Sequence, residues 1–335
     1  MTGFAHADMF AGLGGFSEGA EQAGSHTVWA GNHWPVAVET HAANHPLAVH
    51  VCADMHATDF TAVPRVDMLL AGPACQGHSA AGNARAGERA KVKHDADRAT
   101  ALAVINALEV IRPAWSVTEN VPAWLRWPLF DLWLAMVHRL GYEAEVLRLP
   151  ANHYGAPQAR LRVFVVATLL GRAALDRAIA DVRSRVLAPE QRRTVADFAQ
   201  WDAGTWRDSV SAGEKGSRQR IEAGLALGVD RWWCQHVTNH RGKRADTPLS
   251  TLTGADQHVL CRRAGARVEY RTLLASELLA VQGFPASYKL PSGMTRRNLC
   301  RAIGNAVAVP VARALVGSII AASGRAEALP EEWIA

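Results

Sequence analysis

The chain has few of the residues that build a disulfide-stapled or zinc-stapled domain. Its 335 residues contain five cysteines, at positions 52, 75, 234, 261 and 300, and no two of them form a CxxC pair. Scattered thiols in odd number exclude a disulfide framework and give no pattern of a zinc site. We therefore expect a protein without a metal, working in a reducing compartment such as the cytoplasm.

Long apolar runs and a secretory leader are also missing. No stretch reads as a membrane span, and the amino terminus lacks a basic segment followed by an apolar one. The net charge is +5, from 36 Lys and Arg against 31 Asp and Glu, which is compatible with a nucleic-acid partner without indicating one. The length is enough for one large domain and a smaller one.

The first 170 residues alternate between strand and helix patterns. Expected strands cover 4–9, 27–30, 49–51, 66–70, 116–121, 143–149 and 163–167. Expected helices cover 17–23, 35–43, 98–111 and 130–140. This alternation predicts an α/β fold with a doubly wound, mainly parallel sheet, whose ligands bind at the carboxyl ends of the strands. A further helix, over 274–281, is predicted near the carboxyl terminus, and the stretch 302–320, rich in Ala and Val, is expected to be buried.

A glycine turn follows the first strand. Residues 10–16 carry Gly12, Gly14 and Gly15 between the strand and the next helix. Strand, glycine turn and helix together let a backbone approach a nucleotide-like ligand closely. Any tight turn between a strand and a helix could use these glycines, so a purely structural role stays open.

Two reactive side chains stand at the ends of two expected strands. Cys75 lies in a Gly-Pro-Ala-Cys-Gln-Gly turn after the strand at 66–70, and Glu119 closes the strand at 116–121. A thiol and a carboxyl group at one sheet edge indicate a nucleophile with an acid partner. The alternatives are a structural cysteine and a surface carboxylate.

The chain between Cys75 and Arg98 is small, polar and basic. It is long for a plain connection in a compact domain. It is either a solvated connection or a lid that closes on nucleic acid and places Arg85, Arg89, Lys91 and Lys93 on phosphates.

Residues 171–270 lack the alternation of the first part and hold the whole excess of positive charge. Tryptophans at 201, 206, 232 and 233 are interleaved with arginines. Basic and aromatic residues together suit a surface that contacts bases and phosphates. For each single tryptophan, membership of a small core is the preferred explanation.

Six segments, in this order, resemble motifs of the DNA cytosine-5 methyltransferase family: 8–15, 75–76, 119–121, 158–162, 271–285 and 304–307. The resemblance covers about residues 1–170 and 270–320. It implies a Rossmann-like, S-adenosylmethionine-dependent methyltransferase fold with a discontinuous catalytic domain, 1–170 and 271–335. Residues 171–270 would form an inserted target-recognition domain acting on double-stranded DNA.

The resemblance also implies roles for individual residues. The catalytic residues would be Cys75, Glu119, Arg160 and Arg162. The residues that hold S-adenosylmethionine would be Phe10, Gly12, Leu13, Gly14, Asn32, His33, Asp54, Met55, Gly72, Asn305 and Val307. The residues that contact DNA would be Gln76, Ser79, Arg85, Arg89, Asn120 and Arg241.

The implied chemistry is covalent. Cys75 would add to carbon 6 of a flipped-out cytosine while Glu119 holds the ring nitrogens and Arg162 holds O2, so that carbon 5 can accept a methyl group. The chain departs from the usual motifs at Asn32, where an acid is expected, and at Ala74, His78 and Ala306. The alternatives are an RNA cytosine-5 methyltransferase and a non-catalytic DNA-binding relative with an altered donor pocket.

Overall fold

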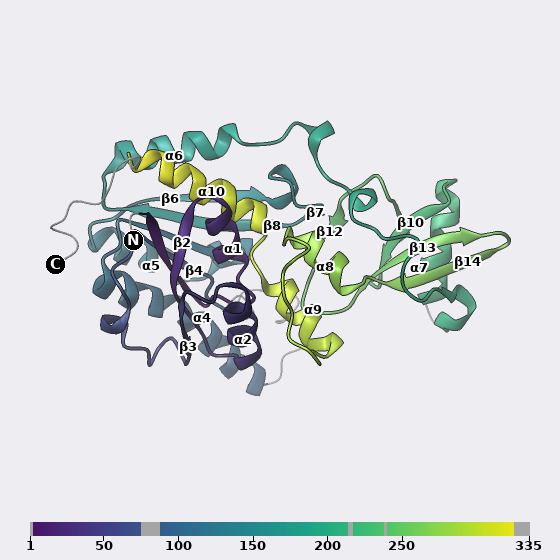
Figure 1. Ribbon diagram of the computed structural model, residues 1–335, viewed down its shortest axis with the longest axis horizontal. Coiled ribbons are helices and arrows are strands. Elements are labelled where there is room, and N and C mark those ends of the chain that lie inside the picture. The colour runs from purple at the N-terminus through teal and green to yellow at the C-terminus, as the bar shows by residue number, and fades with distance from the viewer. Residues whose placement is uncertain (1–2, 75–87, 214–216, 238–239, 325–335) are drawn as a thin grey trace.

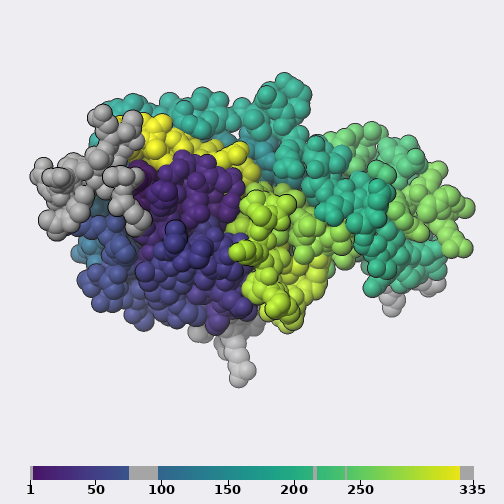
Figure 2. Space-filling model, viewed as in Figure 1, coloured from purple at the N-terminus to yellow at the C-terminus, as the bar shows by residue number. Residues whose placement is uncertain are grey.

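The computed structural model describes residues 3–74, 88–213, 217–237 and 240–324, with the side chains of 88–96 left aside. The chain forms a large lobe built on a seven-stranded sheet and a smaller lobe that projects from it (Figure 1 and Figure 2). Segments from both ends of the sequence, coloured purple and yellow, lie side by side in the large lobe.

The large sheet has the strand order β3-β2-β1-β4-β5-β8-β6. Its strands are β1 (Phe4–Met9), β2 (Ser25–Asn32), β3 (Val49–Cys52), β4 (Met68–Ala71), β5 (Trp115–Asn120), β6 (Glu143–Pro150) and β8 (Leu161–Thr168). β1 to β5 pair in parallel, whereas β8 runs antiparallel to both β5 and β6. The strand order reverses direction at β1 and β4, which is where an open α/β sheet leaves a ligand crevice. The predicted fold class is confirmed.

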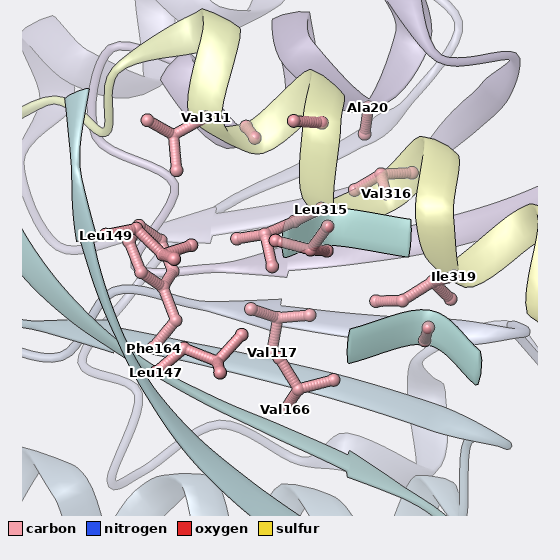
Figure 3. Packing of buried hydrophobic residues seen from close by; sticks show 14 of the residues in the cluster. Ala20, Val117, Leu147, Leu149, Phe164, Val166, Val311, Leu315, Val316 and Ile319 are labelled. Carbon is pink, nitrogen blue, oxygen red and sulfur yellow. The ribbon is translucent and has the colours of Figure 1, made fainter. Parts of the chain in front are cut away.

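Helices cover both faces of this sheet. One face carries α1 (Gly15–Gln22), α6 (Arg172–Ser184) and α10 (Val309–Ala322), and the other carries α4 (Glu88–Ile111) and α5 (Phe130–Arg139). α2 (Pro35–Asn44) packs on β2 and β3. In Figure 3, Leu315 and Ile319 of α10 point toward Val117 and Val166 of the sheet. The last described helix thus belongs to the same core as the strands.

The carboxyl-terminal stretch that was expected to be buried belongs to two helices. α9 (Arg296–Asn305) ends before an extended segment, and α10 begins at Val309 with Pro310 in its first turn. Proline cannot donate the amide hydrogen bond of a continuing helix, and it disfavours helical geometry in the preceding residue. The stretch 296–322 is long and apolar enough to cross a membrane by composition. Because this stretch forms two separate helices and is mostly buried against the large lobe, we assign it to the core of that lobe.

The segment before residue 98 was expected to be a loop, but its last part is helical, because α4 begins at Glu88. Alanine, lysine, arginine and glutamate favour helix even without an apolar face, so the polar composition of 88–97 concealed the helix. Arg89, Lys91 and Lys93 therefore lie on a helix rather than in a loop. The part of the predicted lid that precedes Glu88 is outside the described residues.

The smaller lobe is an antiparallel sheet of order β11-β10-β13-β14-β9. Its elements are β9 (Arg207–Asp208), α7 (Ser217–Glu222), β10 (Arg231–Gln235), β11 (Lys243–Arg244), β13 (His258–Ala264) and β14 (Arg267–Thr272). Trp232 is fully buried in a small core between this sheet and α7, as preferred for a single tryptophan. The lobe begins later than residue 171, because the apolar side of α6 packs into the core of the large lobe.

Short elements join the two lobes. β7 (Gln158–Ala159) pairs in parallel with β12 (Leu249–Ser250), and α8 (Ala275–Gln282) follows β14. Single-turn helices complete the described chain: η1 (Phe60–Ala62), η2 (Pro122–Arg126), η3 (Ala151–His153), η4 (Pro189–Gln191), η5 (Val195–Asp197), η6 (Ser209–Ala212) and η7 (Ala223–Leu227).

Replacing Leu315 by alanine should destabilise the large lobe. The side chain is completely buried between α10 and the sheet, so the change leaves a cavity and should lower the free energy of unfolding by about 2–5 kcal/mol. The matched control is Leu47→Ala, since Leu47 is 95 % exposed and its loss should change stability by less than about 0.5 kcal/mol. Chemical denaturation checks both, and equal effects would contradict this assignment of the core.

Candidate active site

A cavity of about 390 Å³ opens at the carboxyl ends of β1, β2, β4 and β5. Ten of the eleven predicted donor-binding residues line it: Phe10, Gly12, Leu13, Asn32, His33, Asp54, Met55, Gly72, Asn305 and Val307. Glu119 lines it as well. The two parts of the sequence that carry the motifs therefore meet in one cavity, with the segment between α9 and α10 as one wall.

The glycine turn forms the floor of this cavity. Phe10 adopts a left-handed backbone conformation, with φ of 62°, which is uncommon for a residue with a side chain and is typical of a functional turn. Gly15 faces Val307 so closely that an added Cβ would lie 2.2 Å from the Val307 carbonyl oxygen. This glycine is required because the wall at 305–307 rests directly on the start of α1.

Gly14 is the predicted donor-binding residue that does not line the cavity. It caps α1 with φ of 90°, and a Cβ there would meet Tyr288, His41 and His45. Its role in the described structure is to admit these side chains behind the turn. The Tyr288 hydroxyl donates a hydrogen bond to the Leu13 carbonyl, which fixes the turn from that side.

Two polar side chains of the cavity each use one of their groups in a hydrogen bond with the backbone. The Asn32 Oδ1 accepts a hydrogen bond of 2.9 Å from the Trp34 amide, which leaves the Asn32 Nδ2 as a donor. The Asp54 Oδ1 accepts one of 3.0 Å from the His56 amide, which leaves Oδ2 as an acceptor. A ligand with oxygen acceptors near Asn32 and an amino group near Asp54 matches these two groups.

Several cavity residues were not predicted as site residues. They are Asp8, Ala11, Phe16, Trp34, His56, Pro73, Ala74, Asp97, Thr100, Arg301, Ala302 and Ala306. The Arg301 guanidinium lies 4.8 Å from the centre of the Trp34 ring, so this pair closes one side. Trp34 and Asp8 stand within or next to recognised motifs, which was the available signal. Asp97 and Thr100 come from α4, which carries no motif, and Arg301 lies on α9 before the motif at 304–307.

Glu119 and Arg162 form an ion pair at the inner end of the cavity. The Arg162 Nε lies 3.0 Å from the Glu119 Oε1, with both side chains largely buried. The N–H is not aligned on that oxygen, so among the described residues Oε1 has no hydrogen bond. Burial raises the pKa of the Glu119 carboxyl, and Arg162 and Arg160 only partly oppose this. A carboxyl group so placed is suited to sharing a proton with a ligand.

The Arg160 side chain hydrogen-bonds to three backbone carbonyls. Its guanidinium is buried and donates to the carbonyls of Leu252, Gly304 and Ala306 at 2.9–3.0 Å. It does not line the cavity. The residue therefore ties the end of β7 to the wall at 304–306, which is a positioning role in support of the site.

Asn120 is likewise committed to the protein. Its side-chain oxygen accepts from the Val121 amide at 2.8 Å and its Nδ2 donates to the Pro73 carbonyl at 3.3 Å. These bonds connect β5 to the turn that precedes Cys75. The amide keeps a second N–H and a second lone pair, so these two bonds do not by themselves exclude the predicted DNA contact of Asn120.

The other predicted contacts lie elsewhere. Arg241 is exposed on the smaller lobe between β10 and β11, away from the cavity. Cys75, Gln76, Ser79 and Arg85 lie outside the described residues, and the side chain of Arg89 is not described. Within the described ranges, no group of three or more His, Cys, Asp or Glu side chains could hold a metal ion.

Residues 4–321 match the family model of C-5 cytosine-specific DNA methylases. The chain belongs to this family. Its enzyme class is DNA (cytosine-5-)-methyltransferase.

Relatives of this methylase include type II methyltransferases. It is 27 % identical to M.NlaX of Neisseria lactamica over 94 % of this chain and 96 % of that enzyme. It is 33 % identical to M.AgeI of Thalassovita gelatinovora, over 49 % of this chain and only 39 % of that longer enzyme.

Solved structures share the fold of the methylase. S. pombe Dnmt2 superposes with a TM-score of 0.68 at 16 % identity, covering 96 % of this chain and 99 % of that one. An E. coli prophage DNA modification methyltransferase gives 0.65 at 20 % identity, covering 96 % and 100 %.

Because Gly15 lies so close to Val307, we expect that adding a side chain at Gly15 lowers the stability of the protein. Gly15→Ala should push the wall at 305–307 away from the glycine turn and destabilise the protein by about 1–3 kcal/mol, as overpacking does. Gly317→Ala is the matched control, because its Cβ would meet only the Arg185 side chain and the Ala23 Cβ, at ordinary contact distances of 3.5–3.9 Å, and alanine favours helix by up to about 1 kcal/mol. Denaturant titration should move the two variants in opposite directions, and a stabilised Gly15→Ala would refute the contact.

Proposed function

We propose that this methylase transfers a methyl group from S-adenosylmethionine to carbon 5 of a flipped-out cytosine in duplex DNA, through a covalent bond to Cys75. The observation that carries the proposal is the shared cavity, because donor-side residues from both ends of the chain and Glu119 line the same space.

The cavity residues fit S-adenosylmethionine. The Asp54 Oδ2 is free to accept from the adenine amino group, and the Asn32 Nδ2 is free to donate to the ribose hydroxyls. Asn32 replaces the usual acid, so the ribose bond lacks charge assistance. Phe10, Asn305 and Val307 would enclose the remainder. When bound, S-adenosylmethionine supplies the electrophilic methyl group.

The residues of this chain would prepare the base. The Cys75 thiolate adds to carbon 6, which breaks the aromaticity of the ring and makes carbon 5 nucleophilic. A protonated Glu119 donates to N3, and its other oxygen accepts from the amino group at C4, which stabilises the charge entering the ring. Arg162 donates to O2 and keeps Glu119 in place. Loss of the carbon-5 proton and elimination of the sulfur restore the pyrimidine.

Reaching carbon 6 requires the nucleotide to leave the duplex, which costs roughly a few kcal/mol. The smaller lobe, with exposed Arg231, Arg241, Lys243 and Arg244, would contact the duplex beside the cavity. Competition between duplex DNA and transfer RNA for the enzyme distinguishes the proposed DNA methylation from RNA methylation. Preferred binding and methylation of transfer RNA would overturn the DNA assignment.

The covalent step predicts that Cys75→Ser abolishes methylation. Serine is far less nucleophilic than a thiolate, so bisulfite sequencing of DNA from cells that express the variant should find no modified cytosine above background. With 5-fluorocytosine DNA and S-adenosylmethionine, the wild type should form an adduct that survives denaturing electrophoresis. Cys52→Ser is the control, because this exposed thiol on β3 should be dispensable. Undiminished methylation by Cys75→Ser would refute the mechanism.

The acid role predicts that Glu119→Gln lowers the single-turnover methylation rate by at least about 10²-fold, the usual size of a lost general acid. Its raised pKa means that the wild-type rate falls as the pH rises through that pKa, since the protonated carboxyl is lost. The control is Glu109→Gln, an exposed carboxylate on α4 that should leave the rate unchanged. Equal rates for the two variants would exclude Glu119 from catalysis.

A further inference from the structure

A chain of hydrogen bonds leads from the donor cavity to the edge of the large lobe. The Asp8 carboxyl at the end of β1 lines the cavity, and its Oδ2 lies 2.8 Å from the Ser17 hydroxyl. The Ser17 Oγ lies 2.9 Å from the His41 Nε2, and the His41 Nδ1 lies 2.8 Å from the His50 Nε2. Asp8, Ser17 and His41 are at most 1 % exposed, whereas His50 is partly open to solvent.

At its cavity end, this series of hydrogen bonds leaves one carboxylate oxygen of Asp8 unpaired among the described residues. The Asp8 Oδ1 is buried and has no hydrogen-bond partner among the described residues. An unpartnered buried carboxylate oxygen is costly, so the group needs either a proton or a positively charged partner. Burial raises the pKa of Asp8 to about 7, with the Ser17 hydrogen bond opposing the rise.

We propose that Asp8 receives a positively charged group of the methyl donor, and that Ser17, His41 and His50 carry away the proton that Asp8 loses when this group arrives. This rests on the proposed function. It adds that donor binding is coupled to proton release, through residues that are mostly outside the cavity.

The four groups allow two complete proton arrangements. With Asp8 neutral, its O–H donates to Ser17, Ser17 donates to the His41 Nε2, and the His41 Nδ1–H donates to the His50 Nε2. With Asp8 ionised, every bond reverses: Ser17 donates to Asp8, His41 Nε2–H to Ser17, and His50 Nε2–H to His41. Every hydrogen bond is kept in both arrangements, which is what a proton path requires.

The change from the first arrangement to the second moves one proton to the surface. Asp8 loses it, and Ser17 and His41 each gain one proton and give one up. His50, which also bonds to the Ala48 backbone, ends as an imidazolium. Partial burial lowers the pKa of His50, so the imidazolium passes its proton to water. No oxidant, reductant or further reactant is needed.

Other titratable groups surround this path. They are His6 on β1, Glu18 and Glu21 on α1, His45 directly after α2, and Tyr288 after α8. Burial lowers the pKa of His41, and His45, His50 and His6 lower it further, so His41 stays neutral and passes protons without storing one. The Glu21 Oε1 lies 2.9 Å from the His45 Nδ1 and so offsets charge on that side.

Calorimetric titration of the full chain with S-adenosylmethionine, in buffers of different ionisation enthalpy, tests the proposal. About half a proton should be released per donor bound near pH 7, and fewer as the pH rises. The affinity should rise about tenfold between pH 6 and pH 8 and level off above, because a cation binds the ionised carboxyl and the lost proton follows linkage. S-adenosylhomocysteine keeps the ammonium and lacks the sulfonium, so it identifies which group Asp8 faces. Methylthioadenosine carries neither charge, and its affinity should not change with pH.

Variants separate the path from a purely structural role. Asp8→Asn should remove proton release and flatten the pH profile while methylthioadenosine still binds. Ser17→Ala should move the midpoint to higher pH, since Ser17 lowers the pKa of Asp8. His50→Gln should keep the number of protons released but slow their appearance at least tenfold, followed with a pH-indicator dye in stopped flow. His26→Gln, an exposed histidine on β2 outside the path, should match the wild type.

Donor binding without proton release at pH 7, or an unchanged pH profile in Asp8→Asn, would overturn the proposal and leave the proposed function intact. Absence of S-adenosylmethionine binding at every pH by a protein that unfolds cooperatively would instead defeat the proposed function. Methylthioadenosine binding and thermal unfolding show whether each variant is folded, so loss of fold is recognised separately.

Discussion

The buried guanidinium of Arg160 is the constraint on which the rest of the site depends. It joins three carbonyls of two distant segments, at 252 and at 304–306, to the short strand β7. Gln158 extends the junction, because its Nε2 donates to the Val281 carbonyl and its Oε1 accepts from the Leu252 amide. Charge-assisted bonds to backbone, out of water, leave these segments little freedom. The lobes and the cavity wall are therefore fixed by one polar cluster.

This junction explains how a discontinuous domain makes one cavity. The segment between α9 and α10 is extended, so Asn305 and Val307 face the glycine turn instead of being turned away by a continuous helix. A second polar contact secures the neighbouring side of the smaller lobe, where Arg271 and Glu277 form a buried ion pair of 2.7 Å between β14 and α8. This ion pair adds a second buried polar contact beside the cluster around Arg160.

Much of this arrangement was predictable from the sequence, for identifiable reasons. The parallel strands had short apolar runs ended by glycine or proline, and the motifs marked the cavity at Phe10, Glu119 and Asn305. The failures have equally physical causes. The polar start of α4 has helix propensity without an apolar face, α6 lacks a motif that would assign it to a lobe, and the break before Pro310 is hidden in a continuously apolar sequence. Arg160 carried the family motif, yet only packing reveals that its donors serve backbone carbonyls.

The wall at 305–307 has a consequence for how the enzyme is made. The glycine turn leaves the ribosome nearly three hundred positions before the residues that rest on it. Contacts so distant in sequence form late, because the intervening chain must first be ordered. A nascent chain that has already completed its first strands and the whole smaller lobe still has an open, unfinished pocket. The cavity is therefore complete only once residues 305–307 have been synthesised and have docked on the glycine turn.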